Sequence, residues 1–160
     1  MCSRIQGFSE RIPGRKVSGL EYQDLLDCCA EKNFSYGSWL LSEFGRTDDV
    51  RRIDGDLITK KSIIFAGRLE VSGIIKAGEG IKAGLGIEAG WGIKAGWGIE
   101  AGEGIEAGWG IEAGKGIKAG CEFGIYAGLR VRITSEYRKI IAKTKPENIM
   151  CGEFVEAENE

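Results

Sequence analysis

A six-residue repeat fills the centre of the chain and limits the possible folds more than any other feature. From Ile75 the pattern I-[KE]-A-G-x-G continues through eight consecutive matches, the last of which is the partial unit IKAG that starts at Ile117. Stepping backward by six, the aliphatic position falls on Leu69, Ile63 and Leu57. Because a fixed period outweighs the propensities of single residues, the fold must stack one local unit many times.

The residues of one unit predict its shape. In I-x-A, apolar and charged residues alternate with the period of a strand, and G-x-G marks a corner. Two glycines in every six residues would each cost an α-helix roughly 1 kcal/mol relative to alanine. A disordered glycine-rich linker would not keep isoleucine and alanine in register. We therefore expect a mainly β fold, a parallel β-solenoid with inward columns of isoleucine and alanine and hydrogen bonds between coils.

The expected solenoid covers residues 56–134. After Ile117 the next matches to the repeat, Ile125 and Val131, are displaced by two residues, and the insertion lies in Cys121-Glu122-Phe123. We expect this insertion to bulge out as a loop.

The segment before the repeat has the pattern of helices. Ser18-Gly-Leu-Glu21 has the form of a capping box and precedes apolar residues at helical spacing to about residue 31. A second helix is expected from Ser35 to Phe44, ended by Gly45. The end of a solenoid is an open row of strand hydrogen-bonding groups. Residues 1–55 are therefore expected to form a small helical cap, and residues 135–160 a C-terminal cap with an acidic tail.

The repeat over residues 57–134 resembles that of the hexapeptide-repeat left-handed parallel β-helix proteins, and it also resembles the strands of bactofilin-type solenoids. The first resemblance implies three hexads in each coil. The glycines are placed differently, since Gly78, Gly84 and their successors follow the alanine rather than the aliphatic residue. The handedness and the number of hexads per coil are therefore left open by the sequence.

The known enzymes among hexapeptide solenoids are acyltransferases with a histidine general base and a carbonic anhydrase class with zinc-binding histidines. This chain contains no histidine. A carboxylate would act as a general base near neutral pH only if burial shifted its pKa strongly. We expect the repeat carboxylates to point outward in ladders with the lysines instead; they are Glu88, Glu100, Glu106 and Glu112. The sequence thus predicts no catalytic residues and disfavours an acyltransferase-like enzyme.

Metal, cofactor and membrane signals are weak. The five cysteines lack C-x-x-C spacing, which argues against a zinc site and a disulfide framework; they are Cys2, Cys28, Cys29, Cys121 and Cys151. The G-x-G glycines are not part of a G-x-x-x-x-G-K-[ST] loop. The net charge is -2, and no run is long and apolar enough to span a bilayer. We expect a cytoplasmic protein without metal, cofactor, small-molecule substrate or membrane partner.

The fifth position of the repeat holds the candidate partner-binding residues. It carries Leu85, Trp91, Trp97 and Trp109, whereas other units have Glu79, Glu103 and Lys115 there. Because a position that accepts Glu and Lys faces water, the tryptophans predict an exposed aromatic strip suited to a partner surface. With three hexads in a coil, Trp91 and Trp109 would stack and Trp97 would lie in a neighbouring column. The alternative is that the rings merely cover glycine-rich corners.

A second candidate surface is basic. It comprises Arg130, Arg132, Arg138, Lys139, Lys143 and Lys145, and glutamates follow it toward the C-terminus. These residues predict either a phosphate-binding patch beside an acidic tail or a self-neutralising cap.

These features favour a non-catalytic binding protein. One hypothesis is a stoichiometric inhibitor of a host or rival macromolecular machine, of the kind that phages use against host defence, as anti-CRISPR proteins do. Its partner would be another protein or a protein–nucleic acid complex, and the exposed tryptophans also predict a homo-oligomer, a dimer in the simplest case. The alternative from the structural class is a self-assembling, bactofilin-like scaffold.

Overall fold

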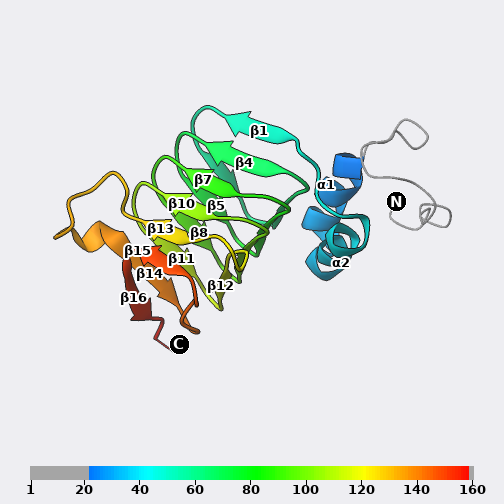
Figure 1. Cartoon of the computed structure of the whole chain (residues 1–160). Coiled ribbons are helices and arrows are strands. Elements are labelled where there is room, and N and C mark those ends of the chain that lie inside the picture. The colour runs from blue at the N-terminus through cyan, green and yellow to red at the C-terminus, as the bar shows by residue number, and fades with distance from the viewer. Residues whose placement is uncertain (1–21, 159–160) are drawn as a thin grey trace.

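The computed structural model describes residues 22–158, which form two helices followed by a column of short strands (Figure 1). The helices are α1 (Tyr22–Lys32) and α2 (Phe34–Phe44). All strand pairs are parallel, and the strands wind into a solenoid of about six turns. The expected fold class is therefore confirmed. Neither helix in the described part of the chain is long and apolar enough to cross a membrane.

Three sheets run along the solenoid. Sheet 1 contains β1 (Val50–Ile53), β4 (Arg68–Val71), β7 (Ile87–Ala89), β10 (Ile105–Ala107), β13 (Ile125–Ala127) and β15 (Ile149–Cys151). Sheet 2 contains β2 (Leu57–Thr59), β5 (Ile75–Ala77), β8 (Ile93–Ala95), β11 (Ile111–Ala113), β14 (Lys139–Ala142) and β16 (Glu153–Glu156). Sheet 3 contains β3 (Ile63–Phe65), β6 (Ile81–Ala83), β9 (Ile99–Ala101) and β12 (Ile117–Lys118).

The strand register fixes the coil at three hexads. Ile87 pairs with Ile105, and Ile93 pairs with Ile111, so that each residue lies on the one 18 positions later. The isoleucines from Ile75 to Ile117 are at most 5% exposed, and the alanines that follow them at most 8%. The predicted inward columns are therefore confirmed, and they form one continuous core.

The two-residue insertion lies outside the strands, as expected. Ile105 pairs with Ile125, so the coil that contains Cys121 to Phe123 has two extra residues, and these three side chains are exposed. The polypeptide then departs from the expectation, because Val131 lies in no strand.

The strands extend past residue 134, where the sequence pattern had placed the end of the solenoid. A short 3-10 turn (Glu136–Arg138) leads into β14, which pairs with β11, and β16 then pairs with β14. Ile140 and Ala142 continue the inward columns and are fully buried. These last strands lack the G-x-G corners, so a search for the complete hexad does not find them.

The two expected helices are present. Gly45 ends α2 in a left-handed conformation (φ 79°), and its N–H donates to Leu41 O at 3.0 Å. The helix begins at Phe34 because the Asn33 side chain accepts a hydrogen bond from Tyr36 N. The proposed capping box at residues 18–21 lies outside the described residues.

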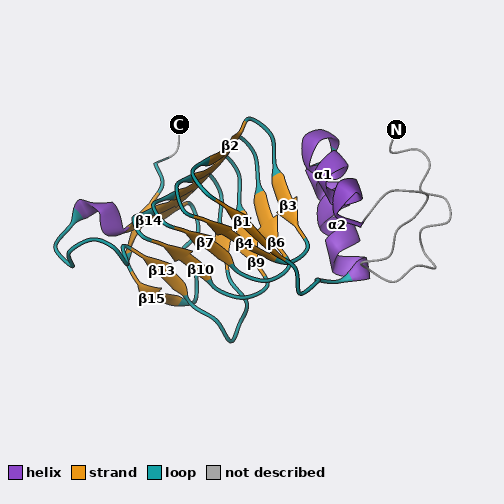
Figure 2. Ribbon diagram, turned by 90° about the horizontal axis from the view of Figure 1, so that it is seen from above, coloured by secondary structure: helices purple, strands orange, loops and turns teal. Residues whose placement is uncertain are grey.

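Helix α1 covers the open edge of β3, at the end of sheet 3 (Figure 2). The Gln23 side-chain amide donates to Ile64 O (2.8 Å), and its oxygen accepts from Ala66 N (3.0 Å). Ser62 N also donates to Ala30 O on the helix (3.3 Å). The helix thus satisfies backbone groups that a preceding coil would otherwise pair.

Tyr22 joins the two helices. Its hydroxyl lies 3.3 Å from Leu40 O and 3.2 Å from Gly45 O, at the end of α2. Burial raises the pKa of Tyr22 to about 12. The hydroxyl therefore keeps its proton, and with it the ability to donate, throughout the neutral range.

Candidate binding surface

Three aromatic rings are stacked at the corner between sheets 1 and 2. We call Trp91, Trp109 and Tyr137 the aromatic ladder. The centroids of Trp91 and Trp109 are 5.3 Å apart at an interplanar angle of 13°, and those of Trp109 and Tyr137 are 5.1 Å apart at 31°. The three residues are 48%, 37% and 62% exposed, respectively. The expected stacking of Trp91 on Trp109 is therefore confirmed.

The backbone of the repeat holds the two indoles in place. Trp109 N donates to Trp91 O at 2.9 Å, which fixes one residue above the other. The glycines before them, Gly90 and Gly108, lie so close to the preceding coil that an added Cβ would meet its carbonyl oxygen at 2.0 Å. Since the chain turns tightly against its neighbour here, the next side chain projects outward.

Tyr137 was not among the residues expected at this site. It comes from the 3-10 turn before β14, where the Ser135 hydroxyl accepts a hydrogen bond from Tyr137 N (3.2 Å). The turn lies outside the hexad register, so the repeat gave no signal for it. Only the position of this aromatic residue, three residues before the apolar stretch of β14 begins at Ile140, could have indicated its role.

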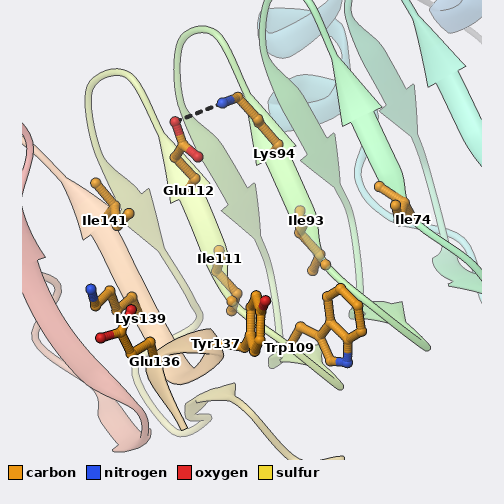
Figure 3. A pocket seen from close by; sticks show the side chains of 12 residues that line it. Ile74, Ile93, Lys94, Trp109, Ile111, Glu112, Glu136, Tyr137, Lys139 and Ile141 are labelled. Carbon is orange, nitrogen blue, oxygen red and sulfur yellow. Dashed lines mark hydrogen bonds and ion pairs between the residues drawn. The ribbon is translucent and has the colours of Figure 1, made fainter.

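A groove of about 270 Å³ lies beside the aromatic ladder on the outside of sheet 2 (Figure 3). Trp109 and Tyr137 border one side, and the Lys94–Glu112 ion pair (2.8 Å) borders another. Its remaining lining residues are Ile74, Gly92, Ile93, Gly110, Ile111, Glu136, Lys139 and Ile141. The groove therefore combines apolar and aromatic walls with charges of both signs, as protein-binding surfaces commonly do.

Trp97 and Leu85 lie elsewhere on the solenoid. The Trp97 ring packs edge-on against Phe34 of α2, with 6.3 Å between the ring centroids. Lys115 Nζ lies 5.5 Å from the centroid of the Trp97 ring. Leu85 is half-buried in the third corner column, where Glu103 N donates to Leu85 O. The structure thus brings two of the four expected residues together and gives Trp97 a contact with the helical cap.

The six basic residues do not form one cluster. Arg130 lies beside the Gly108 backbone, and Lys139 borders the groove at the aromatic ladder. Arg138 is partly buried and donates to Ile133 O at 2.6 Å. Arg132, Lys143 and Lys145 are exposed, and Lys145 borders a different groove, over sheet 3. This distribution gives less support to a single phosphate-binding patch.

The groove over sheet 3 is larger, at about 890 Å³, and runs from Phe34 to the segment 144–148. Its lining includes core residues such as Ile99 and Ile117, which are at most 5% exposed. Its outward side chains include Glu100 and Lys118. Among the described residues, its lining contains no tryptophan or tyrosine, the residues that are most enriched among those that dominate binding energy.

The outward charges of the repeat form ladders, as expected, but not with the same composition on each sheet. On sheet 2 Lys94 pairs with Glu112, and on sheet 3 Lys82 pairs with Glu100 (3.4 Å). On sheet 1, three glutamates lie in register, namely Glu70, Glu88 and Glu106. The expectation of ladders between glutamates and lysines is therefore wrong for sheet 1, where Glu70 pairs with Arg52 (2.7 Å).

Within residues 22–158, no group of three or more Asp, Glu or Cys side chains lies close enough together to hold a metal ion. Cys121 and Cys151 are free thiols. Comparisons of the chain with protein-family models, with curated proteins and with solved structures gave no match.

Proposed function

We propose that this chain is a non-catalytic binding protein that acts by contact with another protein through the aromatic ladder and the groove beside it. The observation that carries this proposal is the stack of three partly exposed rings next to a groove of mixed polarity. Tryptophan and tyrosine are enriched among the residues that dominate binding energy, and exposed apolar patches mark interaction surfaces.

The setting proposed for this activity is the cytoplasm, because the odd number and the spacing of the cysteines do not match a disulfide framework. The proposed partner is a protein or a protein–nucleic acid complex. A stoichiometric inhibitor of a macromolecular machine, like the anti-CRISPR proteins of phages, would need no more than a rigid scaffold and an exposed hot spot. The 18-residue coil with three strands supports a relationship to the hexapeptide-repeat solenoids. This relationship is also a proposal.

Replacement of both ladder tryptophans tests the proposed surface. Trp91→Glu/Trp109→Glu introduces a residue that the same repeat position accepts at Glu79 and Glu103. We expect partner binding to weaken about 30-fold or more, because truncating a hot-spot residue costs about 2 kcal/mol or more. The partner would first be identified by mass spectrometry of proteins that copurify from the native cell, and its affinity would then be measured by calorimetric titration.

The matched control is Lys115→Glu, which changes the same repeat position in a different column. We expect it to bind normally, and circular dichroism should show both variants to be folded. Normal binding by the double tryptophan variant would contradict the proposal. If loss of the charges between Arg130 and Lys145 abolished binding instead, the partner surface would lie at the C-terminal basic residues.

A self-assembling scaffold is the second candidate, favoured by the exposed residues at the ends of the solenoid. Val50 in β1, Ile58 in β2 and Met150 in β15 are 41%, 62% and 68% exposed. These strands end their sheets, so each has one edge without a strand neighbour. Helix α1 weighs against the scaffold because it covers the edge of β3.

Electron microscopy of the purified chain tests the scaffold, since a scaffold of this kind would form filaments. An acyltransferase-like enzyme is disfavoured by the absence of histidine.

A further inference from the structure

The outer face of sheet 2 carries one outward side chain per strand in an unbroken row. Strand pairing places these residues in register from β2 to β16, and they are Ile58, Lys76, Lys94, Glu112, Ile141 and Val155. The two helices pack instead on β3 of sheet 3, where the outward side chain of Ile64 is buried between them. In the described part of the chain, sheet 2 thus keeps a long outer face without a covering helix.

The row consists of two halves that are complementary to each other. Its midpoint lies between β8 and β11, the central pair of the six strands. Consider a two-fold axis that passes through this midpoint and runs perpendicular to the solenoid axis. It would place Lys94 of each copy opposite Glu112 of the other copy. It would also place apolar Ile58 opposite apolar Val155, and the aliphatic stem of Lys76 opposite Ile141. Opposite charges therefore face each other, and so do the apolar ends.

A two-fold axis parallel to the solenoid would have the contrary effect. Lys94 would then face the same lysine of the second copy, and Glu112 would face the same glutamate. Like charges placed opposite each other across an interface are unfavourable. Charge complementarity thus selects the antiparallel arrangement of the two copies.

The same operation brings the aromatic ladders together. Trp91 of one copy lies at the level of Trp109 of the second copy, because their coils are the third and fourth of the solenoid. Tyr137 lies at the level of Gly73, which belongs to the same corner column, since Trp91 N donates to Gly73 O (3.1 Å). Tyr137, the most exposed ring of the ladder at 62%, therefore lies opposite Gly73, which has no side chain.

We infer that the face formed by sheet 2 and the aromatic ladder binds a second copy of this chain in an antiparallel, two-fold arrangement. This inference rests on the proposed function, because it names a partner for the same surface. Six strands spaced about 4.8 Å apart, and a side of six residues at about 3.3 Å each, give a face of about 24 by 20 Å. An area of about 500 Å² per copy is at the low end for specific interfaces. The dimer should dissociate in the micromolar range, which leaves the face available to another protein at lower concentration.

Analytical ultracentrifugation of the full chain tests the inference without any other partner. We expect the mass to rise from 17.4 kDa toward twice that value as the concentration increases through the micromolar range. Lys94→Glu places glutamate opposite glutamate at two points of the dimer, so we expect its dissociation constant to rise about tenfold or more. Lys94→Glu/Glu112→Lys restores both pairs and should restore the dimer. The control, Lys118→Glu on sheet 3, should dimerise normally.

The fold should survive these substitutions. Within one chain Lys94→Glu breaks an ion pair whose side chains are 51% and 46% exposed. An exposed pair of this kind contributes under about 1 kcal/mol to stability. Loss of dimer with an unchanged circular dichroism spectrum can therefore be assigned to the contact between copies.

Disulfide cross-linking tests the orientation of the two copies. In a Cys2→Ser/Cys121→Ser background, Ile58→Cys/Val155→Cys places thiols at opposite ends of sheet 2, where they meet when two copies pack face to face in the antiparallel arrangement. End-to-end assembly would also bring them together, but it would cross-link the ends of sheet 1 as well. We expect a covalent dimer on oxidation. The matched control is Arg52→Cys/Met150→Cys, at opposite ends of sheet 1, which should remain monomeric.

Three results would overturn the inference: a mass of 17.4 kDa at all concentrations, dimerisation unaffected by Lys94→Glu, or equal cross-linking of the sheet 1 control. A mass that grows beyond the dimer would indicate end-to-end assembly instead. If the chain is monomeric but Trp91→Glu/Trp109→Glu still loses another partner, the proposed function holds and only the self-association fails.

Discussion

Gly102→Ala is expected to lower the free energy of unfolding by about 3 kcal/mol, the upper end of the range typical of overpacked cores. A Cβ at this position would lie 2.1 Å from Gly84 O and 3.1 Å from Gly84 C, which belong to the preceding coil. Both atoms are backbone, so relief requires the two coils to move apart, with strain of the kind that overpacked cores show. Urea denaturation followed by tryptophan fluorescence would measure the change.

Gly116→Ala is the matched control, because it adds the same methyl group to the same repeat. No atom lies within 4 Å of a Cβ built at Gly116. Removing a glycine where the new side chain fits stabilises a protein by about 0.4–1 kcal/mol, since the unfolded chain loses freedom. Equal effects of the two substitutions would show that the close approach of the coils does not determine where the repeat needs glycine.

The two glycines of each hexad have different roles, which the sequence pattern alone does not distinguish. The glycine after each alanine lies against the preceding coil, whereas several of the glycines before an isoleucine have more room. At Gly92 and Gly98, an added Cβ would meet only a carbonyl oxygen at 3.3–3.4 Å. Gly92, one of these open glycines, also lines the groove beside the aromatic ladder, where it leaves room for a partner side chain.

The sequence predicts the repetitive part of the fold because each inward residue follows from a strict period. Alternation within I-x-A fixes which side chains point inward, and the six-residue spacing fixes the corners. Stacking of Trp91 on Trp109 follows from the same period once three hexads make a coil. The regular hydrogen bonds between successive coils follow from the same period.

The remainder depends on contacts between distant segments, which no period encodes. Tyr137 reaches the aromatic ladder only because β14 takes the next place in sheet 2 after an irregular turn. Trp97 has the same local sequence as Trp91, yet it packs against Phe34 because α2 lies at that corner. The amide of Gln23 completes the edge of β3 from 41 residues away. No local sequence pattern indicates any of these contacts.

Ile105→Ala is the second substitution with a large expected effect, a loss of about 2–5 kcal/mol in the free energy of unfolding. Ile105 is fully buried in β10, in the central part of sheet 1, with Ile87 on one side and Ile125 on the other. Deleting a buried branched side chain costs the transfer free energy of the lost atoms and leaves a cavity. The packed coils on both sides limit how far that cavity can close. Thermal and urea unfolding would both report the loss.

Ile63→Ala provides the matched control at the end of the column. Ile63 lies in β3 of the first coil and is only partly buried, so less apolar surface is lost and solvent can reach the vacated space. We expect a loss smaller than that at Ile105 by at least about 1 kcal/mol. In a solenoid each coil contacts only its neighbours, so a central defect weakens two interfaces between coils whereas a terminal defect weakens one. Equal losses at the two positions would mean that the solenoid unfolds as a single unit whose stability does not depend on where the cavity lies.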